Sequence, residues 1–175
     1  MRGRGGLAAA LLGLIGCDAG STYLGGDGPF MVSPRCTSGV TRNLNESEGP
    51  EMAPGRACNT CHAEENAASG EGDAPIFSFA GTVFPTGHEP DDCIGAGAAG
   101  ALVVVTDSAG QTFTAAVNRG GNFVLEEDLF VRPYRAKLIF QGREREMASA
   151  QRNGDCNSCH TAAGTNGAPG RIVLP

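Results

Sequence analysis

The clearest pattern of apolar and polar residues lies in the middle of the chain, between about residues 76 and 145. At its start, Phe77 and Phe79 alternate with Ser78 and Ala80. Such period-two alternation is typical of half-buried strands, and short β-branched runs are typical of buried ones. The segments that show one pattern or the other are 76–84 (IFSFAGTVF), 101–107 (ALVVVTD), 112–118 (TFTAAVN), 122–131 (NFVLEEDLFV) and 134–145 (YRAKLIFQGRER).

Turn signals separate these segments. Residues 107–110 (DSAG) and 118–122 (NRGGN) are short and rich in Gly, Asn and Asp, as hairpin connections are. Several short strands with turns at regular spacing indicate an antiparallel β-sandwich. The sequence therefore predicts a mainly β fold, with a β-sandwich over residues 75–145 between two irregular or short-helical segments, 51–74 and 146–175.

Two further segments show no such pattern. Residues 18–50 and 161–175 are rich in Gly, Ser, Pro and Asn, a composition typical of flexible or irregular chain. We expect residues 17–50 to form a tether, and residues 161–175 to wrap irregularly over their neighbours.

The first sixteen residues, MRGRGGLAAALLGLIG, have the layout of a signal peptide. Arg2 and Arg4 give a basic start, and the apolar stretch from Leu7 to Ile15 is too short to span a bilayer. The tetrad LIGC resembles the lipobox of bacterial lipoproteins, which implies that Cys17 is lipidated and begins the mature chain. An ordinary signal peptide with an incidental cysteine is the alternative. The resemblance implies an exported protein, anchored to the inner or outer membrane and facing the periplasm or the cell surface.

Length and charge narrow the classes of protein. A chain of 175 residues with 41% hydrophobic residues can bury one modest core. It has 13 Lys and Arg against 19 Asp and Glu, a net charge of −6, which becomes −8 without Arg2 and Arg4. This balance excludes a basic surface for nucleic acid and suits a soluble protein or one with a basic partner.

Two nearly identical pentapeptides contain most of the candidate cofactor-binding residues. They are CNTCH at residues 58–62 and CNSCH at residues 156–160, and they use two of the three histidines. Both resemble the CxxCH haem-attachment motif of c-type cytochromes. The resemblance implies two covalently bound haem groups, with Cys58, Cys61, Cys156 and Cys159 as the thioether residues and His62 and His160 as the proximal iron ligands.

The remaining cysteines can also be assigned. Seven is an odd number, which in an exported protein flags an unpaired thiol. If Cys17 carries the lipid and four cysteines belong to the two motifs, only Cys36 and Cys93 remain. In an oxidising compartment they are a candidate disulfide.

Paired cysteines have two other common roles, as zinc ligands and in disulfide exchange. A pair of CxxC motifs can bind zinc, but Cys61 and Cys156 lie much farther apart than in a zinc ribbon, and the two histidines would have no role. A CxxC motif can also exchange disulfides, but it then opens a helix after a strand of a βαβ unit, and no such pattern precedes Cys58.

A haem iron with a proximal histidine has a sixth position, whose ligand tunes its chemistry. The triplet Glu-Met-Ala precedes both motifs, at residues 51–53 and 146–148, which suggests Met52 and Met147 as distal ligands. Packing against a haem edge is the alternative role of these methionines. His88, in the turn-rich loop FPTGHEPDDC, is the runner-up.

A second resemblance covers about seventy residues between the motifs. AGTVFP at 80–85 and GALVVVTDSAGQTFTAAVNRGGNFVL at 100–125 are similar to the carboxypeptidase-regulatory-like, transthyretin-type sandwich. That family implies a β-sandwich without catalysis of its own. The stretch PTGHEPDDCIGAGAAG at 85–100 is longer than the family's usual connection, and it holds His88 and Cys93.

The sequence does not determine whether the two motifs lie at the same end of the sandwich. One motif precedes the first strand of the sandwich and the other follows the last. If those strands are antiparallel in one sheet, both motifs lie at the same end and can exchange electrons. If they are parallel, the motifs lie at opposite ends.

We therefore expect a membrane-anchored dihaem cytochrome that transfers single electrons between exported redox partner proteins, and is a carrier rather than an enzyme. One alternative is a dihaem peroxidase, which normally has a larger helical scaffold. Another is a binding or structural lipoprotein without haem. No catalytic carboxylate or Ser-His-Asp arrangement stands out.

Overall fold

The structure is a computed structural model that describes residues 30–42, 49–127 and 130–175. The expected signal peptide and Cys17 lie outside these residues. The described part is mainly β, with antiparallel sheets, as the sequence predicts. No helix among the described residues is long and apolar enough to cross a bilayer.

The largest sheet has four antiparallel strands in the order β5-β4-β7-β8. Strands β4 and β5 form a hairpin because the Asp107 carboxylate accepts hydrogen bonds from the amides of Ala109 and Gln111, which closes the DSAG turn. Along β4, Val103 and Val105 are buried. The strands are β4 (Leu102–Asp107), β5 (Thr112–Ala116), β7 (Tyr134–Phe140) and β8 (Arg143–Glu146).

A second sheet has three strands in the order β6-β3-β9. Its central strand β3 (Phe79–Phe84) is antiparallel to β6 (Asn122–Leu125) and parallel to β9 (Ile172–Val173). Every residue of β3 is buried. One face of β3 contributes Phe79 and Val83 to the core, so its other face must also be covered by the chain.

The core contains apolar side chains from both sheets. Phe79, Val83 and Phe123 come from the three-stranded sheet, and Val105 and Leu138 from the four-stranded one. Phe79 contacts the rings of Phe123, Phe130 and Tyr134, at centroid distances of 6.0 to 6.5 Å. The two sheets therefore share one hydrophobic core.

Two details of the expected strands were wrong. The turn at 118–122 is tight, since the Asn122 amide donates to Asn118 Oδ1, but it joins strands of different sheets and is not a hairpin. Residues 134–145 form two strands instead of one, because Gln141 and Gly142 both have positive φ and make a two-residue hairpin loop.

Both segments expected to be irregular contain short strands. Within the expected tether, β1 (Phe30–Val32) and β2 (Val40–Arg42) form an antiparallel hairpin. Within 161–175, β9 extends the sheet beside β3. Residues 17–29 and 43–48 of the expected tether lie outside the described part, and its residues 30–42 contain the hairpin.

Cys36 and Cys93, the cysteines left over in the count, form a disulfide that ties the β1–β2 hairpin to the loop after β3. Both are buried, and Cys93 also bridges to the hairpin because it pairs with Thr41. The disulfide therefore fastens the N-terminal hairpin to the β domain.

Replacing Cys36 and Cys93 together by alanine should lower the free energy of unfolding. The bond closes a sequence separation of 57, for which the loss of loop-closure entropy in the unfolded chain is worth about 4 kcal/mol. Urea denaturation measures the change. Adding a reductant should lower the midpoint of the wild-type protein and leave the alanine variant unchanged, and a reductant-insensitive wild type would contradict this stabilisation.

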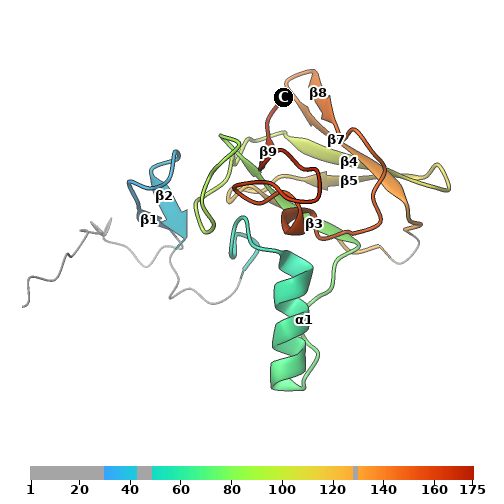
Figure 1. Cartoon of the computed structure of the whole chain (residues 1–175), viewed down its shortest axis with the longest axis horizontal. Coiled ribbons are helices and arrows are strands. Elements are labelled where there is room, and N and C mark those ends of the chain that lie inside the picture. The colour runs from blue at the N-terminus through green and yellow to red at the C-terminus, as the bar shows by residue number, and fades with distance from the viewer. Residues whose placement is uncertain (1–29, 43–48, 128–129) are drawn as a thin grey trace, which may run out of the picture.

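Both helical elements of the described residues begin at the first cysteine of a CxxCH motif. The helix α1 (Cys58–Ser69) extends away from the sheets, and the 3₁₀-helix η1 (Cys156–Ser158) lies beside its N-terminal end (Figure 1). Of the residues in α1, only His62 is buried. The motifs are therefore at the junction between the protruding helix and the β domain.

Candidate functional site

The first motif forms about the first one and a half turns of α1, at the N-terminal end of the helix. His62 is 6% exposed, and its Nδ1 lies 2.5 Å from the carbonyl oxygen of Pro75. A carbonyl only accepts, so Nδ1 is the donor of this hydrogen bond, and in the neutral ring the lone pair is then on Nε2. The ring also contacts Phe77, with centroids 5.4 Å apart. These contacts fix the orientation of the imidazole and leave Nε2 as the nitrogen that can bind a metal.

The second motif has the same arrangement on a different backbone. Residues Cys156 to Ser158 form η1, and the amide of His160 donates to the Cys156 carbonyl. Nδ1 of His160 lies 2.8 Å from the carbonyl oxygen of Gly170, so again Nδ1 is the donor and Nε2 is left for a metal in the neutral ring. Both motif histidines thus have the backbone anchor that is common for metal-ligating histidines.

The asparagine that the motifs share has an equivalent role in each. Asn59 accepts from the amide of Phe77 and donates to its carbonyl, at 2.8 and 2.9 Å. Asn157 accepts from the amide of Thr82 and donates to the carbonyl of Arg56. Both asparagines therefore pin their motif to β3 or the residues just before it.

The two motifs lie directly side by side. Asp155, which precedes the second motif, accepts hydrogen bonds at Oδ2 from the amide and the hydroxyl of Thr60 in the first, at 3.0 and 2.9 Å. The bond from Asn157 to Arg56 is a second link. The two motifs therefore lie at the same end of the β domain. The strands next to them are not an antiparallel pair within one sheet, which was the arrangement expected to bring the motifs together.

This contact also explains the start of α1. The residue before the helix, Ala57, has no side chain that can cap the free amides. Asp155 accepts from Thr60, whose amide is one of these, so the cap comes from a residue far along the chain. A negative charge near the N-terminus of a helix also interacts favourably with the helix dipole.

All four motif cysteines are unpaired thiols, and they differ in their surroundings. Cys61 is exposed, while Cys58, Cys156 and Cys159 are partly buried. Desolvation, followed by the negative charge of Asp155, raises the pKa of Cys58 to about 12. Desolvation also raises the pKa of Cys156 to about 12, and Cys58 and Asp155 contribute to this shift. Both first cysteines are therefore protonated, unreactive thiols in the folded chain at neutral pH.

A cavity of about 270 Å³ opens at the first motif. Cys58, Cys61 and His62 line it together with Met52, so the methionine suggested by the sequence faces the same space as the motif. Asn122 holds the methionine backbone, because its side chain donates to the Met52 carbonyl at 2.8 Å. The apolar part of the lining comes from Phe77, Phe123 and Val124.

The Glu-Met-Ala triplets do not form a structural repeat. Met52 lies in a turn, where its amide donates to the Gly49 carbonyl. Met147 follows strand β8, and its amide donates to the Ala136 carbonyl of β7. This contact places Met147 on the four-stranded sheet, and its role as a ligand of the second motif stays a prediction.

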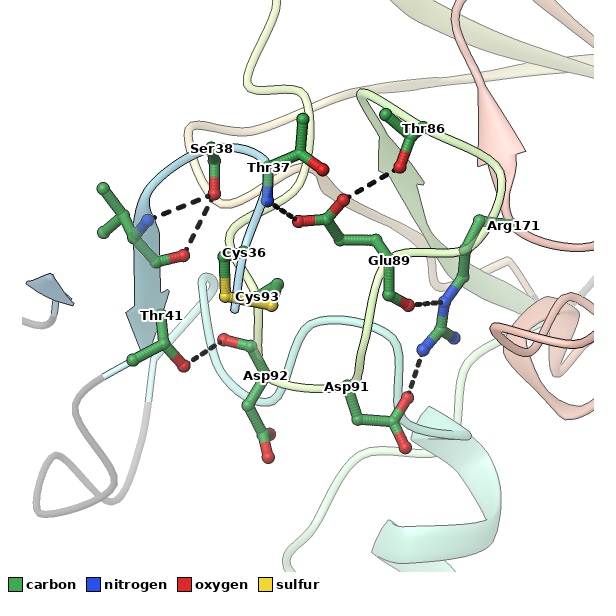
Figure 2. The surroundings of a disulfide bond; sticks show 11 residues. Cys36, Thr37, Ser38, Thr41, Thr86, Glu89, Asp91, Asp92, Cys93 and Arg171 are labelled. Carbon is green, nitrogen blue, oxygen red and sulfur yellow. Dashed lines mark hydrogen bonds and ion pairs between the residues drawn. A yellow bond between two sulfur atoms is a disulfide. The ribbon is translucent and has the colours of Figure 1, made fainter. Parts of the chain in front are cut away.

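His88 belongs to the surroundings of the second motif. Its Nδ1 lies 2.7 Å from the carbonyl oxygen of Ala162, two residues after His160. The loop that carries it is fixed by the Cys36–Cys93 disulfide and by Glu89, which accepts hydrogen bonds from the Thr37 amide and the Thr86 hydroxyl (Figure 2). The long loop that departs from the sandwich pattern therefore brings a histidine to the second motif.

Arg171 connects this loop to the second motif and to the residues just before the first. Its side chain is 1% exposed, and its guanidinium donates to the carbonyls of Gly55, Glu89 and His160. It also pairs with Asp91, as Figure 2 shows, and lies over the ring of Phe84. Arg171 is thus the buried cation of the site, and the sequence contained no signal for it.

The thiols of the two motifs do not gather into one metal site. Among the described residues, the group of three or more metal-binding side chains within 4.8 Å of one another is Cys36, Glu89 and Cys93, and two of these form the disulfide. A zinc site that draws on both CxxC pairs is therefore not supported by their arrangement. Comparisons with protein-family models, with curated proteins and with solved structures found no match for this chain.

Proposed function

We propose that this chain is a dihaem c-type cytochrome that transfers single electrons between redox partner proteins. The observation that carries the proposal is the state of the two motif histidines. Each has its Nδ1 within hydrogen-bond distance of a backbone carbonyl, which leaves Nε2 of the neutral ring for a metal, and each follows two unpaired thiols at CxxC spacing. A bound haem supplies an iron that cycles between Fe(III) and Fe(II).

The donor set fits the group at both motifs. At the first, Cys58 and Cys61 would hold the haem covalently, His62 would be the proximal ligand, and the cavity lined by Phe77 and Val124 offers an apolar surface. At the second, Cys156, Cys159 and His160 have the same roles. The thioethers would remove two thiols whose burial makes ionisation costly.

The distal positions differ between the motifs. Met52 lines the cavity of the first motif, which supports it as the distal ligand there. For the second, the bond between His88 and Ala162 supports His88 over Met147, which lies against β7. A ligand at the sixth position favours electron transfer over peroxide chemistry, so the protein is proposed to be a carrier and not an enzyme.

The β domain serves in this proposal as the scaffold of the two motifs. The shared core of the two sheets supports a β-sandwich of the carboxypeptidase-regulatory-like, transthyretin type, flanked by the haem segments. The signal peptide and Cys17 add an exported, lipid-anchored location at the inner or outer membrane. The acidic charge of the chain suits basic redox partners.

A pyridine haemochrome assay combined with intact mass tests the proposal. Protein matured in a host that attaches haem c should carry two covalent haems. A mass without haem would refute the cytochrome and leave the structural lipoprotein. Rapid turnover of peroxide by a dihaem protein would instead favour the peroxidase.

Replacing Met52 by alanine should abolish methionine ligation at the first motif. We expect the weak long-wavelength sulfur-to-iron band of the oxidised protein to disappear, because Met52 is the methionine that shares the cavity with His62. The matched control is Met147→Ala, which should retain the band. If the band survives in Met52→Ala and disappears in Met147→Ala, the assignment is reversed.

A further inference from the structure

Asp155 is a buried carboxylate between the two motifs. It is 4% exposed, and its Oδ2 accepts from the amide and the hydroxyl of Thr60. Its Oδ1 is buried without a hydrogen-bond partner, the one such side-chain atom found among the described residues. None of the ion pairs in the described part of the chain includes Asp155. Its negative charge is thus offset by hydrogen bonds from a single residue.

The backbone of Asp155 is fixed as firmly as its side chain. Residue 155 forms a parallel bridge with Ala80 of β3, and its amide donates to Asn153 Oδ1. On its other side, the next residue is Cys156 of the second motif. The carboxylate therefore cannot move away from either motif without breaking contacts to the β domain.

The charge of Asp155 acts on both motifs. It is among the causes that raise the pKa of Cys58 and also of Cys156, the first cysteine of each motif. A buried charge is weakly screened, so it acts over longer distances than a surface charge. Both attachment points lie within the range of this one carboxylate.

We propose that Asp155 is a shared positioning residue that sets the reduction potentials of both haems and holds the two motifs together. The inference rests on the proposed function. A fixed negative charge stabilises Fe(III) relative to Fe(II), so it lowers both potentials. The hydrogen bonds to Thr60 keep the first motif next to the second, so that the same charge acts on both irons and electrons can pass between neighbouring groups.

The test is a potentiometric titration of the dihaem protein and its Asp155→Asn variant. Asparagine has the same shape and can still accept from Thr60, but it has no charge. We expect the reduction equilibrium of both irons to shift toward Fe(II), by roughly tenfold each. The matched control is Glu64→Gln, which removes an exposed carboxylate on the same groove between α1 and Asp155 and should change neither potential by a comparable amount.

A second variant keeps the test decisive if Asp155→Asn folds poorly. Thr60→Val removes the hydroxyl donor and keeps the carboxylate, so the charge is less offset and both potentials should fall. The number of covalent haems, measured by the pyridine haemochrome assay, separates a failure of the proposed function from a failure of the role of Asp155. Loss of haem from the wild-type protein refutes the proposed function. Two intact haems, with shifts no larger than those of Glu64→Gln or confined to one iron, overturn the role of Asp155.

Discussion

Replacing Cys58 and Cys61 together by alanine should reduce the number of covalent haems from two to one, and replacing Cys156 and Cys159 should do the same. Each haem in this proposal is held by the two thioethers of its own motif, so the loss is complete for one group and absent for the other. Intact mass measures the number of bound groups directly, and the pyridine haemochrome spectrum confirms their type.

The matched control is the Cys36→Ala, Cys93→Ala double variant, which also removes two cysteines but leaves the motifs intact. It should retain both haems. An unchanged number of covalent haems in the Cys58 and Cys61 variant would contradict haem attachment at the first motif. Retention of two groups after loss of any motif pair would show that the cysteines are not the attachment residues.

The strands could be predicted because their signals are local. Alternation along 112–118 reflects which side chains of β5 face the core, and the DSAG turn is specified by Asp107 within a few residues. Alternation along 76–84 also indicated a strand, although every residue of β3 is buried. The change of sheet at 118–122 could not be predicted this way. Asn118 and Gly121 would suit a hairpin equally well, and the sheet that β6 joins depends on its pairing with β3.

The candidate site shows the same division. The CxxCH spacing identifies the cysteines and histidines locally, but Asp155 and Arg171 act on residues far away in sequence. One signal is present in the sequence without a predicted role: the same asparagine follows the first cysteine of each motif, and it anchors the motif to β3 or the residues just before it. The two Glu-Met-Ala triplets show the opposite case, in which the same residues have different structures. Met52 lies in a turn, whereas Met147 follows a strand.

Replacing Arg171 by methionine should cause the largest loss of stability of any single change considered. Methionine keeps much of the apolar stem against Phe84 but cannot donate to the carbonyls of Gly55, Glu89 and His160. Three acceptors around a 1% exposed side chain then lose a charged donor. Because removing one partner of a buried charged network costs roughly 3–5 kcal/mol, we expect a loss of that order in the free energy of unfolding.

Urea denaturation of the variant measures this loss, and Arg143→Met is the matched control. Arg143 is exposed on the edge strand β8, where such a change alters stability by roughly 0.5 kcal/mol or less. Arg171→Lys should fall between the two, because an ammonium keeps the charge but cannot reach three carbonyls in the directions that the planar guanidinium does. If Arg171→Met unfolds at the same urea concentration as Arg143→Met, the contacts of Arg171 with Gly55, Glu89 and His160 do not stabilise the fold. A full loss in the lysine variant as well would show that the geometry of the guanidinium, more than its charge, joins Gly55 to His160.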